Sequence, residues 1–539
     1  MREIRLLDCT MRDGGYVNDW KFGNKNLISL YERIVDAGVD IVEIGFLDER
    51  RPVDTDRSIM PNTKVADEIF GDLDKKNTMV VAMIDYGTCS IENLQPCKDS
   101  VIDGIRVIFK KHIMHEAMEY CRQVKALGYK VFSQLVSITS YNDEELVEMT
   151  KLVNDVKPYA VSMVDTYGLL YPNDLLHYYE ILDSNVDKDI QIGFHAHNNL
   201  QLAYANSLAF LDRKTDRSIV VDGTLYGMGK SAGNAPLELL SDYLNIKYNK
   251  NYNIKSELEA IDENVMDFYK DSPWGYKTFF YLCAKNKCHP NYLTYFKSKD
   301  ELSESKTDEL LSLIEPDDKK LLYSEKIAEK LYNDYYDGMD LDNKYLSKFK
   351  NEIGNRKILV IGPGKNIVLQ QSKVTDFIKK ENPYVISVNY ISQYINCDCV
   401  FITNGKRYKD MTLDLKNSPI KTLATTNVEC RNGEFDFVIH KSPILENNTK
   451  FKDNSFLMLI NFLQSLGIKE IFCAGFDGYS NKECNYHNPT MEYSFIKQEA
   501  SHLNHYMRKR IGKLRENISI KFITYSAYDQ EDDINRASI

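Results

Sequence analysis

Two histidines, His195 and His197, stand two residues apart in the segment Gly-Phe-His-Ala-His-Asn-Asn. Successive side chains of a β-strand point to opposite faces, so both imidazoles would lie on one face of a strand. Such a pair can hold one metal ion, or it can be two buried histidines that donate to backbone carbonyls. Asp13, where an apolar strand runs into a Gly-Gly turn, favours the metal. Two histidines and one carboxylate leave coordination positions open for water or substrate, as a catalytic metal requires.

The elements that must bring Asp13 and the histidines together follow a regular pattern. Apolar strands alternate with amphipathic helices such as residues 26–35, in which apolar residues recur at i, i+3, i+4 and i+7. This pattern predicts an α/β fold, a (β/α)8 TIM barrel over residues 1–250. The predicted strands are 4–9, 41–46, 79–84, 105–109, 130–137, 160–165, 190–197 and 218–223.

In such a barrel, catalytic residues gather at the carboxyl ends of the strands. Asp13 follows the first strand and the two histidines end the seventh, so the fold would bring them to one mouth. By the alternation, Glu43 and Arg106 point inward. They can bind substrate, or they can pair with one another or with neighbours, because an unpaired buried charge is costly. The loop after strand eight is rich in glycine, and its Asn234 can give the metal one more oxygen.

Length and composition limit the class of protein. The 539 residues exceed what one core normally supports, so at least two domains are expected. Lysine plus arginine total 68 and aspartate plus glutamate 79, a net charge of -11 without long blocks of one sign, which argues against nucleic acid or an anionic membrane as the main partner. We find no apolar run of membrane-spanning length and expect a cytoplasmic protein. The 11 cysteines are expected to be reduced and mostly structural.

Residues 251–352 change character and become acidic, helical in pattern and rich in tyrosine. We interpret them as a helical extension that packs over the barrel mouth. Tyr276 is the polar group of this segment that we expect to reach the site, although a tyrosine is more often a core or interface residue.

A second α/β domain is predicted over residues 353–539. It begins with an apolar strand at 357–361, followed by Gly362-Pro363-Gly364. The glycine turn can hold a phosphate on backbone N–H groups, or it can be an ordinary tight turn, because G-P-G is a much weaker signal than a dinucleotide-binding motif or a P-loop. Further apolar runs, which alternate with helices and predict a parallel, doubly wound, Rossmann-like sheet, lie at 385–391, 399–403, 435–440, 470–475 and 520–525.

Four motifs of the predicted barrel carry a family resemblance. They are Asp-Cys-Thr-Met-Arg-Asp-Gly-Gly from residue 8, Val-Glu-Ile-Gly-Phe from residue 42, Asp-Thr-Tyr-Gly from residue 165 and Phe-His-Ala-His-Asn-Asn from residue 194. Together they resemble the DRE-TIM metallolyases, or HMGL-like family, which includes 4-hydroxy-2-oxovalerate aldolase, 3-hydroxy-3-methylglutaryl-CoA lyase and the 2-isopropylmalate and homocitrate synthases. The resemblance covers residues 1 to about 300 and is greatest to the aldolase branch.

The resemblance implies roles for particular residues. Arg12 matches the family arginine that stabilises an enolate oxygen. The expected cofactor is a divalent metal, with manganese or magnesium favoured and zinc as an alternative. Its expected ligands are Asp13, His195, His197 and Asn234. Apart from what the resemblance implies, we expect Glu43, Arg106 and Thr166 to bind substrate.

The chemistry can also be argued from the residues. A 2-oxo acid such as pyruvate offers a carboxylate oxygen and a keto oxygen to one metal, which acts as a Lewis acid on the carbonyl. Forming or cleaving the adjacent carbon–carbon bond passes through an enolate, whose oxygen Arg12 can hold. The aldolase branch has a histidine three residues after the motif aspartate, where this chain has Tyr16. Tyr16 or Tyr276 is then the expected base, although a free tyrosine with a pKa near 10 is a poor base at neutral pH.

We therefore expect a metal-dependent aldolase, a carbon–carbon lyase that cleaves or forms a 4-hydroxy-2-oxo acid. Its expected partners are a small 2-oxo acid, an aldehyde and further copies of the chain in a homo-oligomer. The alternatives are a Claisen-type acyl-CoA synthase or lyase of the same family, and a catalytically inactive nucleotide-binding scaffold.

The C-terminal domain has a fainter resemblance of its own. Four short motifs are similar to those of Rossmann-like domains in sialyltransferase-like and related nucleotide-binding proteins. They are Gly362-Pro363-Gly364, Val388-Asn389-Tyr390, Phe401-Ile402-Thr403-Asn404 and Gly475-Phe476-Asp477-Gly478. That resemblance implies a nucleotide or nucleotide-sugar ligand for residues 353–539.

Overall fold

The computed structural model describes residues 3–299, 302–315, 320–337, 345–416, 418–430, 433–446, 451–492 and 494–529. The chain divides into two compact units, Met1–Leu293 with Glu315–Tyr323, and Thr294–Ile314 with Ser324–Ile539. The first unit contains a parallel barrel and the second a parallel sheet. The domain limits at residues 250 and 352, and the expected packing of residues 251–352 over the barrel mouth, stay predictions. Among the described helices, none is both long and apolar enough to span a membrane.

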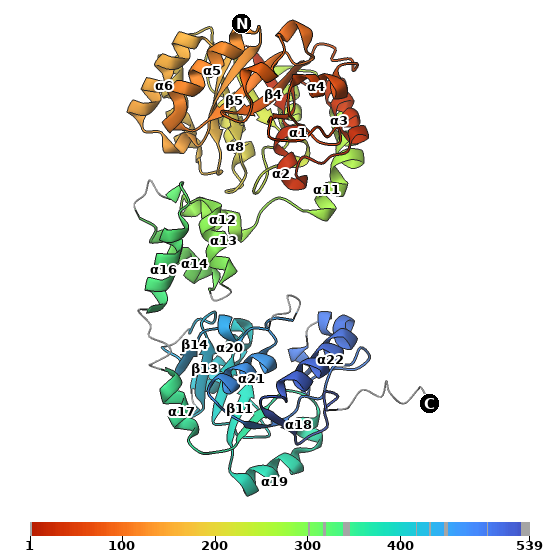
Figure 1. The fold of residues 1–539 in the computed structure, drawn as a ribbon, viewed down its shortest axis with the longest axis vertical. Helices are drawn as coiled ribbons and strands as arrows, with labels where there is room; N and C mark the ends of the chain where they lie inside the picture. Colours follow the sequence, from red (N-terminus) through yellow and green to blue (C-terminus); the bar gives the residue numbers. More distant parts are fainter. Residues whose placement is uncertain are drawn as a thin grey trace. The chain divides into compact units, whose positions relative to one another are not determined.

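Eight parallel strands close the barrel, which confirms the predicted TIM barrel (Figure 1). The first strand pairs with the second on one side and with the last on the other, so the sheet has no free edge. A short extra strand, β3 (Ile59–Met60), pairs only with the end of β2. The barrel strands are β1 (Ile4–Asp8), β2 (Ile41–Leu47), β4 (Met79–Asp85), β5 (Gly104–Phe109), β6 (Lys130–Leu135), β7 (Ala160–Asp165), β8 (Gln191–Ala196) and β9 (Ile219–Gly223).

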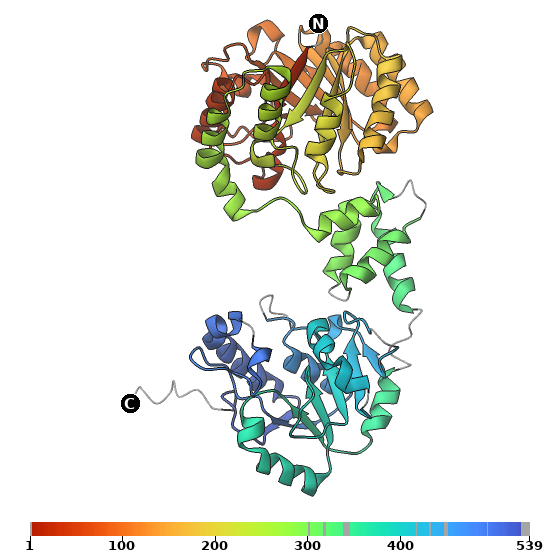
Figure 2. The same cartoon turned by 180° about the vertical axis from the view of Figure 1, so that it is seen from behind.

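Helices surround these strands and cover the outer face of the barrel (Figure 2). Because side chains alternate along a strand, each strand contacts both the barrel interior and the helices. Leu7 packs inside the barrel with Phe132, whereas Leu6 packs outward among the helices. One position departs from the regular pattern, because β4 is followed by short 3-10 turns instead of an α-helix. The outer helices are α3 (Asn24–Asp36), α4 (Thr63–Phe70), α5 (Met114–Ala126), α6 (Asp143–Val156), α7 (Pro172–Asn185), α8 (Ala203–Leu211) and α9 (Leu237–Tyr248).

Two short helices stand at the barrel mouth after β1. They are α1 (Thr10–Asp13) and α2 (Gly15–Asn18), in the region where the sequence predicted a glycine turn. A side chain at Gly15 would collide with the indole ring of Trp20. The glycine is therefore required by close packing at the rim.

The described residues between 251 and 352 are mainly helical, and they are divided between the two units. Their described helices are α10 (Ile254–Ala260), α11 (Met266–Asp271), α12 (Thr278–Lys285), α13 (Pro290–Ser298), α14 (Glu304–Ser312) and α16 (Glu325–Asp337). Helix α17 (Ser347–Ile353) packs through Phe349 into the core of the second unit.

Seven parallel strands form the sheet of the second unit, in the order β14-β13-β12-β11-β10-β15-β16. The chain runs outward from β10 to β14 and then returns to the other side of β10, so the direction of winding reverses there. A second parallel-sheet domain is thereby confirmed. The strands are β10 (Ile358–Ile361), β11 (Tyr384–Val388), β12 (Cys399–Ile402), β13 (Lys421–Thr425), β14 (Phe437–Ile439), β15 (Glu470–Ala474) and β16 (Ser519–Phe522).

Candidate metal centre

Asp13, His195 and His197 come together at the carboxyl ends of β1 and β8, as the barrel geometry requires. The Nε2 atom of His195 lies 4.0 Å from Oδ1 of Asp13, and the Nδ1 atom of His197 lies 3.9 Å from Oδ2. Because metal–nitrogen bonds are about 2.0–2.1 Å long, one ion can bridge donors up to about 4 Å apart. The three side chains therefore fit a single ion.

The donor atoms are buried, and several have no hydrogen-bond partner within the described part of the chain. They include Nε2 of His195, Nδ1 of His197 and Oδ1 of Asn234. Buried polar atoms are normally satisfied, so three unsatisfied atoms around one carboxylate need an explanation. A bound cation supplies one, since each of these atoms carries a lone pair that it can donate.

The loop after β9 positions Asn234 beside Asp13. The Nδ2 group of Asn234 donates to Oδ2 of Asp13 at 2.6 Å, and the backbone N–H of Lys230 donates to the same oxygen at 3.2 Å. A side chain at Gly229 would collide with both Asn234 and Asp13. The glycine loop thus brings Asn234 next to the three donors, although its role as a ligand stays a prediction.

Asp222 is part of this centre and was missed by the sequence analysis. Its Oδ2 atom lies 3.0 Å from Nδ1 of His195, so the imidazole donates there and keeps Nε2 as a lone-pair donor. Asp222 lies on β9, and a carboxylate in the apolar run Ile-Val-Val-Asp-Gly was a signal that could have found it.

Charges in the barrel interior are paired with one another. The Nη1 atom of Arg106 donates to Oε2 of Glu43 at 2.9 Å, and its Nη2 atom contacts Asp222 and Gln134. Arg106 and Glu43 are 1% and 0% exposed. Their mutual pairing is one of the two alternatives that the sequence left open, and their predicted contact with substrate stays a prediction.

Arg12 lies between Glu43 and Asp13 and is 5% exposed. Its Nε donates to Oε2 of Glu43 at 2.7 Å, and its Nη1 donates to Oδ1 of Asp13 at 2.5 Å. Two of its five N–H donors are used in this way. The guanidinium is therefore held in a fixed direction and retains donors for a further acceptor.

Electrostatics at the centre favours an ionised Asp13 carboxylate beside a neutral His197 imidazole. Burial alone would raise the pKa of Asp13, but the neighbouring His197 and Arg12 outweigh it and hold that pKa well below its usual range. Burial lowers the pKa of His197 to about 3. An ionised carboxylate and a neutral imidazole are the forms in which both side chains bind metals.

Tyr16, Tyr276 and Thr166 are the remaining predicted site residues. Tyr16 packs its ring against Trp20, and burial followed by the Asp13 charge raises its pKa to about 12. Tyr276 is 58% exposed. The hydroxyl of Thr166, just after β7, accepts a hydrogen bond from the backbone N–H of Ser137 at 2.7 Å. The roles predicted for these three residues stay predictions.

Comparisons with known proteins match the part of the chain that contains the barrel. Residues 3–264 match the HMGL-like family model. The chain is 29% identical over 241 residues to an oxaloacetate decarboxylase from Mycobacterium tuberculosis, covering 44% of this chain and 69% of that protein. It is 27% identical over 278 residues to a 4-hydroxy-2-oxovalerate aldolase from Chloroflexus aurantiacus, covering 51% and 79%. A solved N-terminal domain from Bacteroides vulgatus, described as that of an aldolase, is 22% identical, with a TM-score of 0.46, and covers 55% of this chain and 96% of that one.

The matched region runs from β1 to beyond α10 and so contains the closed barrel together with Asp13, His195, His197 and Asn234. The resemblance that the four sequence motifs indicated is confirmed there. Residues 3–264 of this chain are a domain of the HMGL-like family, the DRE-TIM metallolyases.

Proposed function

We propose that the barrel is a divalent-metal-dependent carbon–carbon lyase that cleaves or forms a 4-hydroxy-2-oxo acid through a pyruvate enolate. The observation that carries the proposal is the group of buried, unsatisfied donor atoms around Asp13, with the guanidinium of Arg12 beside it. The names of the two curated relatives support a 2-oxo acid as substrate, because oxaloacetate and hydroxy-oxovalerate both contain that group.

The metal would be held by Asp13, His195, His197 and Asn234. When bound, it would supply Lewis-acid polarisation of a substrate carbonyl. Asp222 orients His195 by accepting from Nδ1, which leaves Nε2 directed at the metal position. The protein therefore sets the direction of its ligands before any ion arrives.

Arg12 would stabilise the negative oxygen that develops during the reaction. Its contacts to Glu43 and Asp13 fix the plane of the guanidinium, so the remaining N–H groups are held in fixed directions beside Asp13. A preorganised donor needs little reorganisation when charge develops, and this is the usual source of oxyanion stabilisation. Arginine fits this role because its charge is permanent and its donors lie in a rigid fork.

Tyr16 would act at neutral pH as a hydrogen-bond donor, since a pKa of about 12 keeps its hydroxyl protonated. It would hold the hydroxyl or aldehyde oxygen of the substrate. Glu43 and Arg106 would position Arg12 and Asp222 from inside the barrel through the contacts described above. Arg12 and Tyr16 would thus contact the substrate, whereas Glu43 and Arg106 would hold the residues around the site in place.

Deuterium exchange tests the proposal without knowledge of the aldehyde. The full chain is incubated with Mn²⁺ or Mg²⁺ and pyruvate in deuterated water, and the methyl signal of pyruvate is followed by NMR. The expected result is loss of the methyl protons at a rate that depends on protein and metal, with no CoA thioester present. The Asp13→Asn variant serves as the matched control.

The position of the label distinguishes the alternatives. A Claisen-type enzyme would enolise an acyl-CoA and use the oxo acid only as the electrophile, so exchange would appear on the acetyl group alone. An inactive scaffold would exchange neither compound. Either outcome would replace the aldolase proposal.

A further inference from the structure

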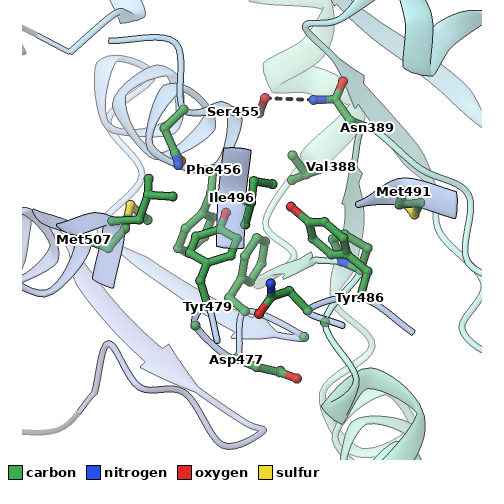
Figure 3. Close-up of a pocket in the computed structure, with 18 of the residues that line it drawn as sticks. Val388, Asn389, Ser455, Phe456, Asp477, Tyr479, Tyr486, Met491, Ile496 and Met507 are labelled. Carbon is green, nitrogen blue, oxygen red and sulfur yellow. Dashed lines mark hydrogen bonds between the residues drawn. The ribbon is translucent and has the colours of Figure 1, made fainter. Parts of the chain in front are cut away.

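The second unit contains a cavity of about 340 Å³ at the carboxyl ends of its strands. It lies among the loops that follow β10, β11 and β15, where the winding of the sheet reverses (Figure 3). In doubly wound sheets, ligands bind at this position. The volume also falls within the range of about 300–1,000 Å³ that is usual for small-molecule sites.

Aromatic side chains dominate one part of this cavity, which we name the aromatic chamber. Phe456 and Phe476 stack with their ring centroids 3.7 Å apart and their planes 16° from parallel. Tyr479 and Tyr486 also line the chamber, and Figure 3 shows their rings turned toward it. Flat rings with hydroxyls at their edges suit a planar ligand that has polar atoms on its rim.

A neighbouring cavity of about 220 Å³, which we name the polar chamber, shares Asn404, Asp453 and Ser455 with the aromatic chamber. Lys441 lines the polar chamber, and within the described residues its ammonium group has neither an ion-pair nor a hydrogen-bond partner. Asp453 provides a carboxylate in the same space. A lysine and an acid together suit a group with both anionic oxygens and hydroxyls.

A hydroxyl proton is available between the two chambers. The Nδ2 group of Asn389 donates to Oγ1 of Thr403 at 2.9 Å and to Oγ of Ser455 at 2.8 Å. Those two oxygens lie 2.7 Å apart, so one hydroxyl donates to the other. Among the described residues the second hydroxyl proton has no acceptor, so it can be donated to a ligand. Ser455 also begins helix α21 (Ser455–Ser465), whose dipole favours negative charge at this end.

The Gly362-Pro363-Gly364 turn does not provide the anion site. The N–H of Gly362 donates to the carbonyl of Ala474 at 2.8 Å, and the N–H of Gly364 donates to the carbonyl of Gly475 at 2.8 Å. These two groups are therefore already used, and the turn joins β10 to the loop after β15. Lys441 and the Thr403–Ser455 pair are the groups that we assign to an anion in this region.

We propose that the two chambers form one binding site for a nucleoside phosphate. The base lies in the aromatic chamber, and the ribose phosphate extends past Ser455 toward Lys441 and Asp453. The stacked rings and the unpaired ammonium group are the two observations that select this class, because the ligand must be aromatic at one end and anionic at the other. The site belongs to a different unit from the metal donors and is independent of the lyase proposal.

Isothermal titration calorimetry on the full chain tests this assignment. The probes are the four ribonucleoside monophosphates, the corresponding nucleosides and inorganic phosphate. At least one monophosphate is expected to bind with a Kd below about 1 mM. Its nucleoside should bind about tenfold or more weakly, the scale of one charge-assisted hydrogen bond.

Single substitutions test which side chains bind the phosphate and which bind the base. Lys441→Met should weaken the monophosphate to the level of its nucleoside, whereas Lys379→Met, an exposed lysine on α19 (Gln371–Glu381), should change nothing. Ser455→Ala should weaken the monophosphate several-fold, with Ser465→Ala at the other end of α21 as its control. Tyr486→Leu should weaken nucleoside and monophosphate equally, and its urea midpoint checks that the domain is folded.

Three results would overturn the proposal. The first is that none of the monophosphates binds. The second is that nucleosides bind as tightly as monophosphates. The third is that Lys441→Met and Ser455→Ala leave the affinity unchanged, which would place the nucleotide elsewhere.

Discussion

Replacement of Arg12 by lysine separates the charge of this residue from its geometry. The guanidinium contacts Oε2 of Glu43 at 2.7 Å and Oδ1 of Asp13 at 2.5 Å and still has three N–H donors. A lysine ammonium is a single point that can keep one of these contacts. It cannot also reach the substrate oxygen in the same plane, so Arg12→Lys should lose the oxyanion contact while the local charge stays the same.

The expected effect on rate follows from the number of donors lost. Removal of one oxyanion donor lowers kcat by about 10²–10³-fold, or about 2.7–4 kcal/mol of transition-state stabilisation. Because Arg12 is not one of the unsatisfied donor atoms and lysine keeps the positive charge beside Asp13, metal content should be unchanged. The loss should therefore appear in kcat at saturating metal.

The assay is the rate of pyruvate methyl exchange at saturating metal and pyruvate, with metal content measured on the same samples. Arg50→Lys is the matched control, because Arg50 pairs with Asp48 but has a side chain that is 66% exposed. That change should alter the rate by less than about twofold. Unaltered exchange in Arg12→Lys would remove Arg12 from the mechanism.

Three further predictions address the centre and the fold. Asp13→Asn should weaken metal binding and abolish exchange, since it removes the charge among the donors; full metal content by elemental analysis would contradict this. Burial raises the pKa of Glu257 to about 8, so this carboxyl loses its proton at a lower pH in the unfolded chain than in the folded protein. The free energy of unfolding should therefore fall as pH rises from about 4.5 to 8, by at most about 1.4 kcal/mol per pH unit. Glu257→Gln should remove this pH dependence of the free energy of unfolding. Urea midpoints that change equally between pH 5.5 and 7.5 in the variant and in the unmodified protein would refute the prediction. Gly15→Ala should displace Trp20 and destabilise the barrel by about 1–3 kcal/mol; unchanged tryptophan fluorescence and urea midpoint would count against this packing role.

The sequence by itself determined the barrel, the placement of the three metal donors and the family. The first two depend on local periodicity, because strands and helices alternate over 250 residues and a period of two places His195 and His197 on one face. The family was indicated by the four motifs. Barrel topology then brings Asp13 to the same mouth, because the first strand pairs with the last. Strand β13 was missed because Lys421 and Thr422 begin it and leave a short apolar run.

Only the tertiary structure decided how the charges pair. Asp222 contacts His195 and Arg106, which are 27 and 116 residues away in the sequence, and no periodic pattern specifies such contacts. The use of the Gly362 and Gly364 N–H groups by the loop after β15 is likewise a long-range contact. The chambers lined by Phe456, Phe476 and Lys441 exist only once separate strands are adjacent in one sheet. Periodicity fixes which face a residue occupies, whereas its partner depends on the packing of distant elements.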